Sequence, residues 1–259
     1  FEKATQYCDS LKTETSFKKE NKDDIQFFVM RYFDIIDFTY EYENYQETIS
    51  RCHQLESIAE QYDLGLPKLL INAKMGTSYE KIKAYEKALY HIKIAENVVD
   101  KERFYSSKFS IQIIKAMILS GMNKNEEAIT IGKKTLEQIV FEKTKKNIRL
   151  DQIKFENVSD LADTYFINIF EKVADLYLNQ YKSTKEKKSL KTAENLYVIS
   201  GKLFQKYYVK GEFNDYLNYY HLEITEGLLQ CLTLELSSYE QKIKLLNSIE
   251  NNASQHLTK

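Results

Sequence analysis

The chain has 259 residues, 43% hydrophobic and 29% charged, so it has enough apolar side chains to bury a core and is not expected to be disordered. Its 37 basic and 38 acidic residues leave a net charge of -1, which gives no overall field to attract nucleic acid or an anionic membrane. Seven glycines and one proline are too few to punctuate strands joined by tight turns. These numbers favour an all-α protein.

The first residues, Phe1-Glu2-Lys3-Ala4, match a pattern that recurs later as Tyr85-Glu86-Lys87-Ala88. The match predicts that residues 1 to about 18 form the second helix of a pair whose first helix is missing. We therefore expect the chain to be a fragment of a longer protein.

The next segment predicts a helix pair. Asp23 and Asp24 can cap a helix that runs to about Glu43, because a short carboxylate accepts hydrogen bonds from first-turn amides. A second helix is expected from Asn44 to about Tyr62. Residues 63–67 (DLGLP) then predict a break, with Gly65 ending one helix and Pro67 opening the next.

Residues 72–95 (NAKMGTSYEKIKAYEKALYHIKIA) predict two short helices packed face to face. Gly76 would let the two backbones approach closely, Tyr79 would fill the space beside it, and Ala88 is small where the partner helix crosses. The small residue of this pattern recurs as Thr48, Ala88 and Ala128, so that Ala88 lies midway between the other two in the sequence. The two equal intervals indicate a real repeat.

The second half of the chain is less regular. A turn is expected at residues 100–103, a helix at 109–121, and a loop or helix extension at 144–158. Ser159-Asp160 can cap a long helix to about Tyr181, and a lysine-rich interruption follows at residues 182–191. The last predicted pair covers residues 214–236 and 238–254.

The pattern of residues 72–95 resembles the tetratricopeptide repeat. The family's consensus residues correspond to Met75, Gly76, Tyr79, Ala88, Ile92 and Ala95, whereas Asn72 and Asp100 stand where the family usually has Trp and Pro. The resemblance implies a right-handed α-solenoid of antiparallel helix pairs, forming a single domain over residues 1–259. One unpaired helix and five pairs give about eleven helices.

No sequence motif indicates catalysis. Cys8, Cys52 and Cys231 form no CxxC pair, and the histidines are solitary, without the HxxxH spacing that binds metal; we interpret them as surface or groove-edge residues. No nucleophile elbow or phosphate-binding loop is present. We therefore expect no enzyme activity, cofactor or metal.

The resemblance also implies a binding surface, because in this family the first helix of each pair lines an inner groove. The corresponding residues are Met30, Phe33, Asp37, Tyr40, Leu70, Thr77, Glu80, Ser110, Ile113, Met117, Asn168, Glu171 and Asp175. Their mixture of carboxylates and apolar groups suits a peptide with hydrophobic anchors and a basic group. The alternative is that these residues pack against one another or against a terminal helix folded into the groove.

The expected function is therefore a non-enzymatic scaffold that binds a protein segment or peptide, as the sensing region of a bacterial signalling or transcription regulator. One alternative is the peptide-pheromone receptor domain of a quorum-sensing regulator, in which Asn168 and the groove carboxylates clamp the ligand. Another is the accessory region of an enzyme whose catalytic part is missing. We expect no nucleic-acid binding by this segment and no membrane insertion, since the apolar run at residues 25–40 contains Arg31 and two aspartates. The sequence allows a homodimer. It also allows a location on either side of the membrane, of which the cytoplasm is favoured.

Overall fold

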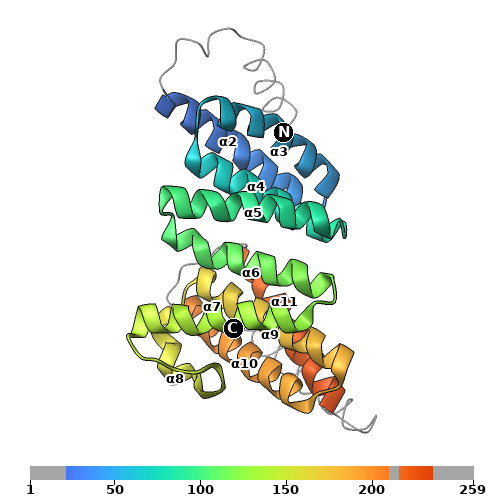
Figure 1. Cartoon of the computed structure of the whole chain (residues 1–259). Helices are drawn as coiled ribbons and strands as arrows, with labels where there is room; N and C mark the ends of the chain where they lie inside the picture. The colour runs from blue at the N-terminus through green and yellow to red at the C-terminus, as the bar shows by residue number, and fades with distance from the viewer. Residues whose placement is uncertain (1–21, 210–215, 236–259) are drawn as a thin grey trace, which may run out of the picture. The chain divides into compact units, whose positions relative to one another are not determined.

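The computed structural model describes residues 22–209 and 216–235 (Figure 1). The described residues are all-α and contain no strand. The α-helices are α2 (Lys22–Glu41), α3 (Tyr45–Gln61), α4 (Gly65–Lys81), α5 (Tyr85–Glu102), α6 (Tyr105–Gly121), α7 (Asn125–Thr144), α8 (Phe155–Val158), α9 (Thr164–Thr184), α10 (Lys187–Val209) and α11 (Tyr216–Glu235). The predicted helices at residues 1–18 and 238–254 lie outside the described part of the chain.

Two compact units divide the chain, Phe1–Lys124 and Asn125–Lys259. Within each unit, neighbouring helices pack in pairs, as expected of a helical repeat. The prediction of a single domain over residues 1–259 stays a prediction.

Unit 1 has a strict local period. A non-glycine residue with positive φ recurs at a constant interval, at Glu43, Asp63, Lys83, Arg103 and Asn123. Each lies in a short turn between helices, where a left-handed residue reverses the chain. Two such intervals contain two helices. Together they equal the sequence spacing between successive predicted small positions, which are Thr48, Ala88 and Ala128. The repeat interval read from the sequence is therefore confirmed.

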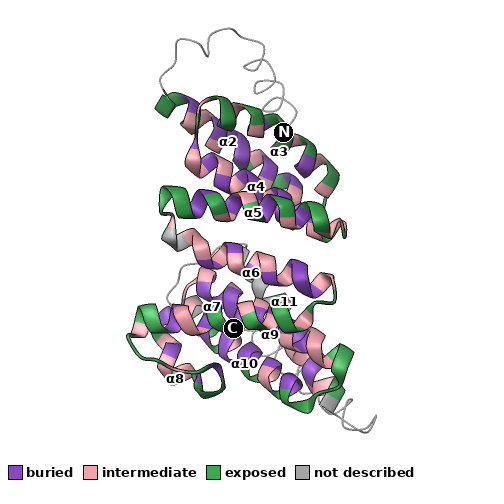
Figure 2. Ribbon diagram, in the orientation of Figure 1, coloured by how far each residue is buried: buried purple, intermediate pink, exposed green. Residues whose placement is uncertain are grey.

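The predicted small positions lie where helices cross. Thr48, Ala88 and Ala128 are fully buried, each at the same place in the first turn of its helix. A Cβ atom added at Gly76 would lie 2.5 Å from Ile92 Cδ1, which confirms that α4 and α5 approach closely there. Figure 2 shows the buried residues concentrated on the helix sides that face neighbouring helices.

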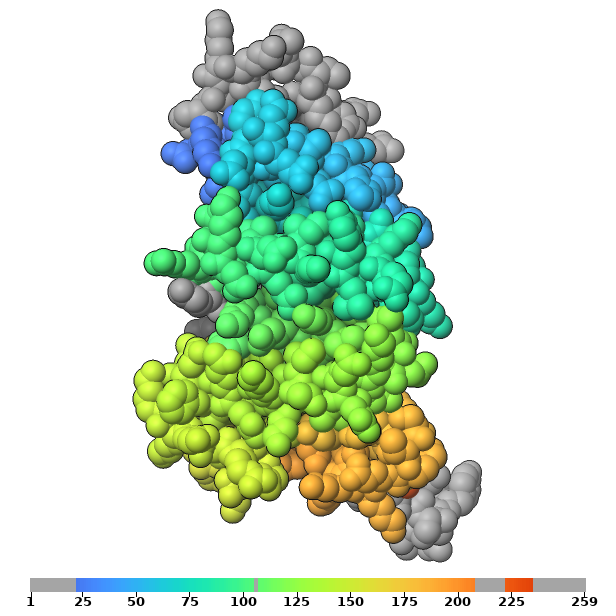
Figure 3. All heavy atoms as spheres, viewed as in Figure 1, coloured from blue at the N-terminus to red at the C-terminus, as the bar shows by residue number. Residues whose placement is uncertain are grey.

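The first helices of the pairs in unit 1 form one layer. Helix α4 packs against α2 and α6 as well as against its neighbours in sequence, whereas α3 and α5 have no comparably close contact with each other. Because the first helices are more closely spaced than the second helices, α2, α4 and α6 lie on the inner side of unit 1. In the space-filling view, α5 crosses the front of this unit (Figure 3).

Three predicted boundaries in unit 1 are wrong by a few residues. The turn expected at residues 100–103 is one of them, because α5 continues to Glu102. Gly65 begins α4 and does not end α3, because Asp63, with φ 49°, takes the left-handed position of the turn. Helix α6 begins at Tyr105, earlier than the predicted start at Phe109, because Arg103 ends α5 with φ 59° and leaves room for only a short turn.

Unit 2 continues with α7 and an irregular connection. Two 3₁₀ turns, Leu150–Gln152 (η2) and Ser159–Leu161 (η3), flank α8 before the packed helices α9, α10 and α11. The predicted cap at Ser159-Asp160 is wrong, because these residues form η3. Asp163 caps α9 instead, and its Oδ1 accepts a hydrogen bond of 2.9 Å from the Phe166 amide.

The lysine-rich segment is largely helical. Only Lys185 and Glu186 separate α9 from α10, so most of residues 182–191 extend the two helices and do not form a loop. Among the described helices, none is long and apolar enough to cross a membrane.

Candidate functional site

Most of the predicted binding residues in unit 1 are half-buried on the inner helices. They are neither in the core nor fully exposed, which is the burial expected of residues that line a shallow surface: Met30, Asp37, Tyr40, Leu70, Thr77, Glu80, Ser110 and Met117. Phe33 and Ile113 are 7% and 4% exposed, which places them in the core. For these two residues the packing alternative fits the structure better than ligand contact.

An aromatic and charged cluster joins α2 to α4 on this inner side. Lys74 Nζ lies 2.8 Å from Asp37 Oδ1, as an ion pair without good hydrogen-bond alignment, and 4.2 Å from the centre of the Tyr40 ring. The Tyr40 ring meets Tyr45 edge-on with centroids 5.4 Å apart. Burial raises the pKa of Tyr45, and the charges of Glu43 and Glu80 raise it further. Glu43 and Glu80 therefore place negative charge near Tyr45, while Lys74 compensates the charge of Asp37.

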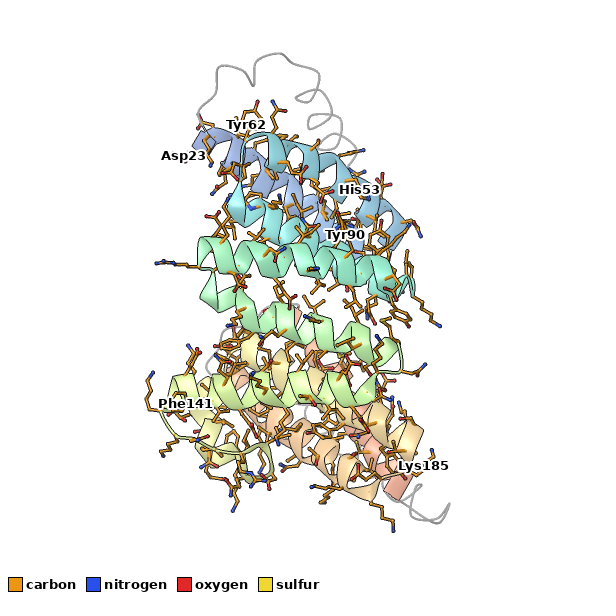
Figure 4. All side chains as sticks on the ribbon, viewed as in Figure 1. Asp23, His53, Tyr62, Tyr90, Phe141 and Lys185 are labelled. Atoms are coloured by element: carbon orange, nitrogen blue, oxygen red, sulfur yellow. The ribbon has the colours of Figure 1, made fainter. Side chains whose placement is uncertain are left out.

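A second cluster in unit 1 contains two histidines. His91 on α5 is 6% exposed, and its Nδ1 lies 2.8 Å from Asn72 Oδ1 on α4. The Tyr79 ring stacks on His91 with centroids 5.4 Å apart, and His53 Nε2 on α3 lies 3.4 Å from the Tyr79 hydroxyl. His53 and Tyr90, labelled in Figure 4, lie at the edge of this cluster. The prediction of a surface histidine is wrong for His91, because the buried Asn72 gives its ring a partner.

The titratable groups of this cluster are held in inert forms. Burial, with a smaller effect from His53, lowers the pKa of His91 to about 4, so the ring is neutral at pH 7. Burial also raises the pKa of the Cys52 thiol to about 12, which removes its nucleophilic form. These residues stabilise α3, α4 and α5 and do not resemble a catalytic centre.

In unit 2 the predicted residues Glu171 and Asp175 meet around one lysine. Lys172 Nζ lies 3.1 Å from Glu171 Oε1, 3.3 Å from Glu223 Oε2 and 3.9 Å from Asp175 Oδ2. Glu223 comes from α11, and the others come from α9. We call Glu171, Lys172, Asp175 and Glu223 the carboxylate cluster. Asn168 lies one turn earlier on α9 and is half-buried.

A tyrosine from α10 closes the base of the carboxylate cluster. Tyr197 is fully buried, and its hydroxyl donates a hydrogen bond to Asp175 Oδ1. Its ring lies against α11 at Gly227, where an added Cβ atom would be 2.3 Å from the ring. Because only glycine leaves that space, Gly227 fixes where the Tyr197 hydroxyl can lie.

Burial and mutual repulsion set the protonation of this cluster. Burial raises the pKa of Glu171 well above its usual range; Lys172 opposes this effect, and the charges of Asp175 and Glu223 add to it. Burial alone would lower the pKa of Lys172, but the three carboxylates outweigh it and raise that pKa. Burial and Asp175 raise the pKa of Tyr197. Lys172 is therefore charged and Tyr197 neutral at pH 7.

Unit 2 also has a polar cavity of about 190 Å³ where α7, η2, α9 and α10 meet. Its wall includes Tyr177, whose pKa is raised to about 12 by burial and by the charges of Glu137, Asp151 and Glu186. Cations and carboxylates both line it: Lys133, Arg149, Asp151, Glu186 and Lys188. This mixture does not select one ligand charge.

Sequence reasoning found half of the carboxylate cluster. Glu171 and Asp175 are one helical turn apart and must share one face of α9, a signal visible in the sequence. Tyr197 and Glu223 come from other helices, so no local spacing could have placed them there. No group of three His, Cys, Asp or Glu side chains suited to a metal occurs among the described residues.

Comparison with known proteins identifies no family for this chain. No family model matches the chain, and the search of curated proteins finds no significant match. The site must therefore be interpreted from its own geometry.

Proposed function

We propose that this protein is a non-enzymatic helical-repeat scaffold that binds a protein segment or peptide on the inner side of its first helices. The observation that carries the proposal is the row of half-buried polar and apolar side chains on the adjacent helices α2, α4 and α6. An extended or helical ligand needs such a row, with apolar anchors beside hydrogen-bonding groups. Met30, Leu70 and Met117 supply the apolar groups, and Thr77 and Glu80 supply polar ones.

We further propose that the repeat is of the tetratricopeptide type. The family's small and aromatic positions are occupied by residues that pack tightly here: Met75, Gly76, Tyr79, Ala88, Ile92 and Ala95 are all buried. The departure at Asn72 has a local explanation, since its hydrogen bond to His91 replaces the packing of a larger side chain. A regulator's sensing region is the context in which we place this scaffold.

A pair of charge-matched variants tests the proposal. The inner variant combines Thr77→Lys and Glu80→Lys on α4, and the outer control combines Ser50→Lys on α3 with Glu86→Lys on α5, at exposed positions. Both variants change the net charge by the same amount. We expect the inner variant to lose at least about tenfold in affinity for a partner captured from the source cell, equivalent to about 1.4 kcal/mol. Equal loss in both variants, with unchanged helical circular dichroism, would refute binding on the inner side.

A further inference from the structure

The carboxylate cluster holds more negative charge than its surroundings compensate. Three carboxylates surround the single ammonium of Lys172, all within 3.9 Å. Glu171 is 2% exposed, and its Oε2 has no hydrogen-bond partner among the residues that the structure describes. A buried carboxylate oxygen without a hydrogen-bond donor is costly, so the described residues leave Glu171 Oε2 without the donor that would favour its ionised form.

We propose that the carboxylate cluster is a cation-binding site that holds a guanidinium or primary ammonium group of the ligand. Such a group carries several N–H donors and would offset the excess negative charge. Its binding would make Asp175 and Glu223 the outer contacts and Glu171 Oε2 the inner acceptor. This inference rests on the proposed function and names the chemical class of one ligand side chain.

The cluster is reachable from solvent on one side. The side chains of Asp175 and Glu223 are 28% and 24% exposed, whereas Tyr197 and Glu171 are buried beneath them. Tyr197 holds Asp175 in place from below through its hydroxyl. Such a half-open acidic site excludes a bulky neutral group and favours the end of a long cationic side chain.

The test uses the full chain and two small probes that differ in charge. N-acetyl-arginine amide carries the guanidinium, and N-acetyl-citrulline amide has nearly the same shape without the charge. Saturation-transfer NMR at pH 7 should show saturable binding of the arginine compound and none of the citrulline compound. Glu223→Gln should weaken arginine binding at least about tenfold. Asp175→Asn, measured in parallel, should weaken it as well.

A matched control comes from the same helix. Glu226 is exposed, and it accepts a hydrogen bond from Gln230 outside the carboxylate cluster, so Glu226→Gln should leave binding unchanged. Arginine binding should also strengthen as the pH rises above 7, because burial raises the pKa of Glu171 and its negatively charged form, the better acceptor for a cation, becomes more populated at higher pH. Absence of saturable arginine binding up to about 20 mM, equal binding of both probes, or an equal effect of Glu226→Gln would overturn the inference.

The two proposals can fail separately. If the arginine compound binds but the inner variant of unit 1 keeps its partner, the scaffold proposal is wrong and the proposal of a cation-binding site is supported. If the inner variant loses its partner and the arginine compound does not bind, only the proposal of a cation-binding site is refuted.

Discussion

Gly76 controls how closely two helices of unit 1 approach. An alanine Cβ atom there would lie 2.5 Å from Ile92 Cδ1 and 2.7 Å from Ile92 Cγ1, so Ile92 or the backbone must move. We expect Gly76→Ala to lower the free energy of unfolding by about 1–3 kcal/mol, measured by urea denaturation.

Gly201 provides the matched control for this substitution. It also lies inside a helix, but an added Cβ atom would lie 3.7 Å from its nearest neighbour, Ile224 Cγ2. Alanine there should stabilise the protein by about 0.5–1 kcal/mol through helix propensity alone. A stabilising Gly76→Ala would contradict the close crossing of α4 and α5.

His91 gives unit 1 a dependence on acid. Its pKa is about 4 in the folded chain and about 6.5 when unfolded, so the unfolded state takes up the proton first as the pH falls. Its contribution is fully present above pH 6.5 and is lost between pH 6.5 and 4, amounting to about 2 kcal/mol after allowance for relaxation. Urea melts at several pH values measure it.

The control for this prediction is His91→Gln, whose amide can still bond to Asn72 but does not titrate. In that variant the loss of stability between pH 6.5 and 4 should be smaller than in the unchanged chain. An identical loss in both proteins would show that other groups cause the acid dependence.

At the scale of the helix, equivalent positions in the repeat differ in burial. Ile118 on α6 is fully buried, whereas Phe38, two repeats earlier at the same position of α2, is 45% exposed. Ile118→Ala should cost about 2–5 kcal/mol because it leaves a cavity. Phe38→Ala should cost less than Ile118→Ala, since the Phe38 side chain is already 45% exposed in the folded protein. Thermal melts followed by circular dichroism would compare them, and equal costs would contradict the difference in burial between the two positions.

The start of α9 can be tested in the same way. Asp163→Ala removes the side-chain cap on the Phe166 amide and should cost about 0.5–2 kcal/mol. Asp160→Ala removes only an exposed ion pair with Lys206 and should cost less than about 0.5 kcal/mol. A larger effect at Asp160 would restore the boundary predicted from the sequence.

These elements show where sequence reasoning works. Helices α2 to α5 follow from the equal spacing of the small positions and from short polar turns, because each local pattern repeats and checks the others. The start of α9 was misplaced because Ser159-Asp160 and Asp163 both offer capping oxygens, and only packing decides between them. Asp175 was predicted from the groove positions that the family resemblance implies, whereas Tyr197 reaches it only because Gly227 leaves room for its ring.

At the scale of the whole molecule, 37 basic and 38 acidic residues nearly cancel. Electrostatic attraction of a ligand must therefore come from local groups of charged side chains. Acidic groups are found at Glu80 on the inner side of unit 1 and in the carboxylate cluster of unit 2. Both suit a ligand that carries basic groups. Raising the salt concentration should therefore weaken partner binding, and this weakening should be reduced in Glu223→Gln.

Hydroxyl-radical footprinting of the full chain with its captured partner most directly tests binding on the inner side. Met30 and Met117 are half-buried on α2 and α6, and Tyr90 is 63% exposed on the second helix α5. We predict that the partner slows oxidation of Met30 and Met117 severalfold and leaves Tyr90 unchanged. Protection of Tyr90 with unaltered oxidation of both methionines would place the partner on the second helices and contradict the proposal.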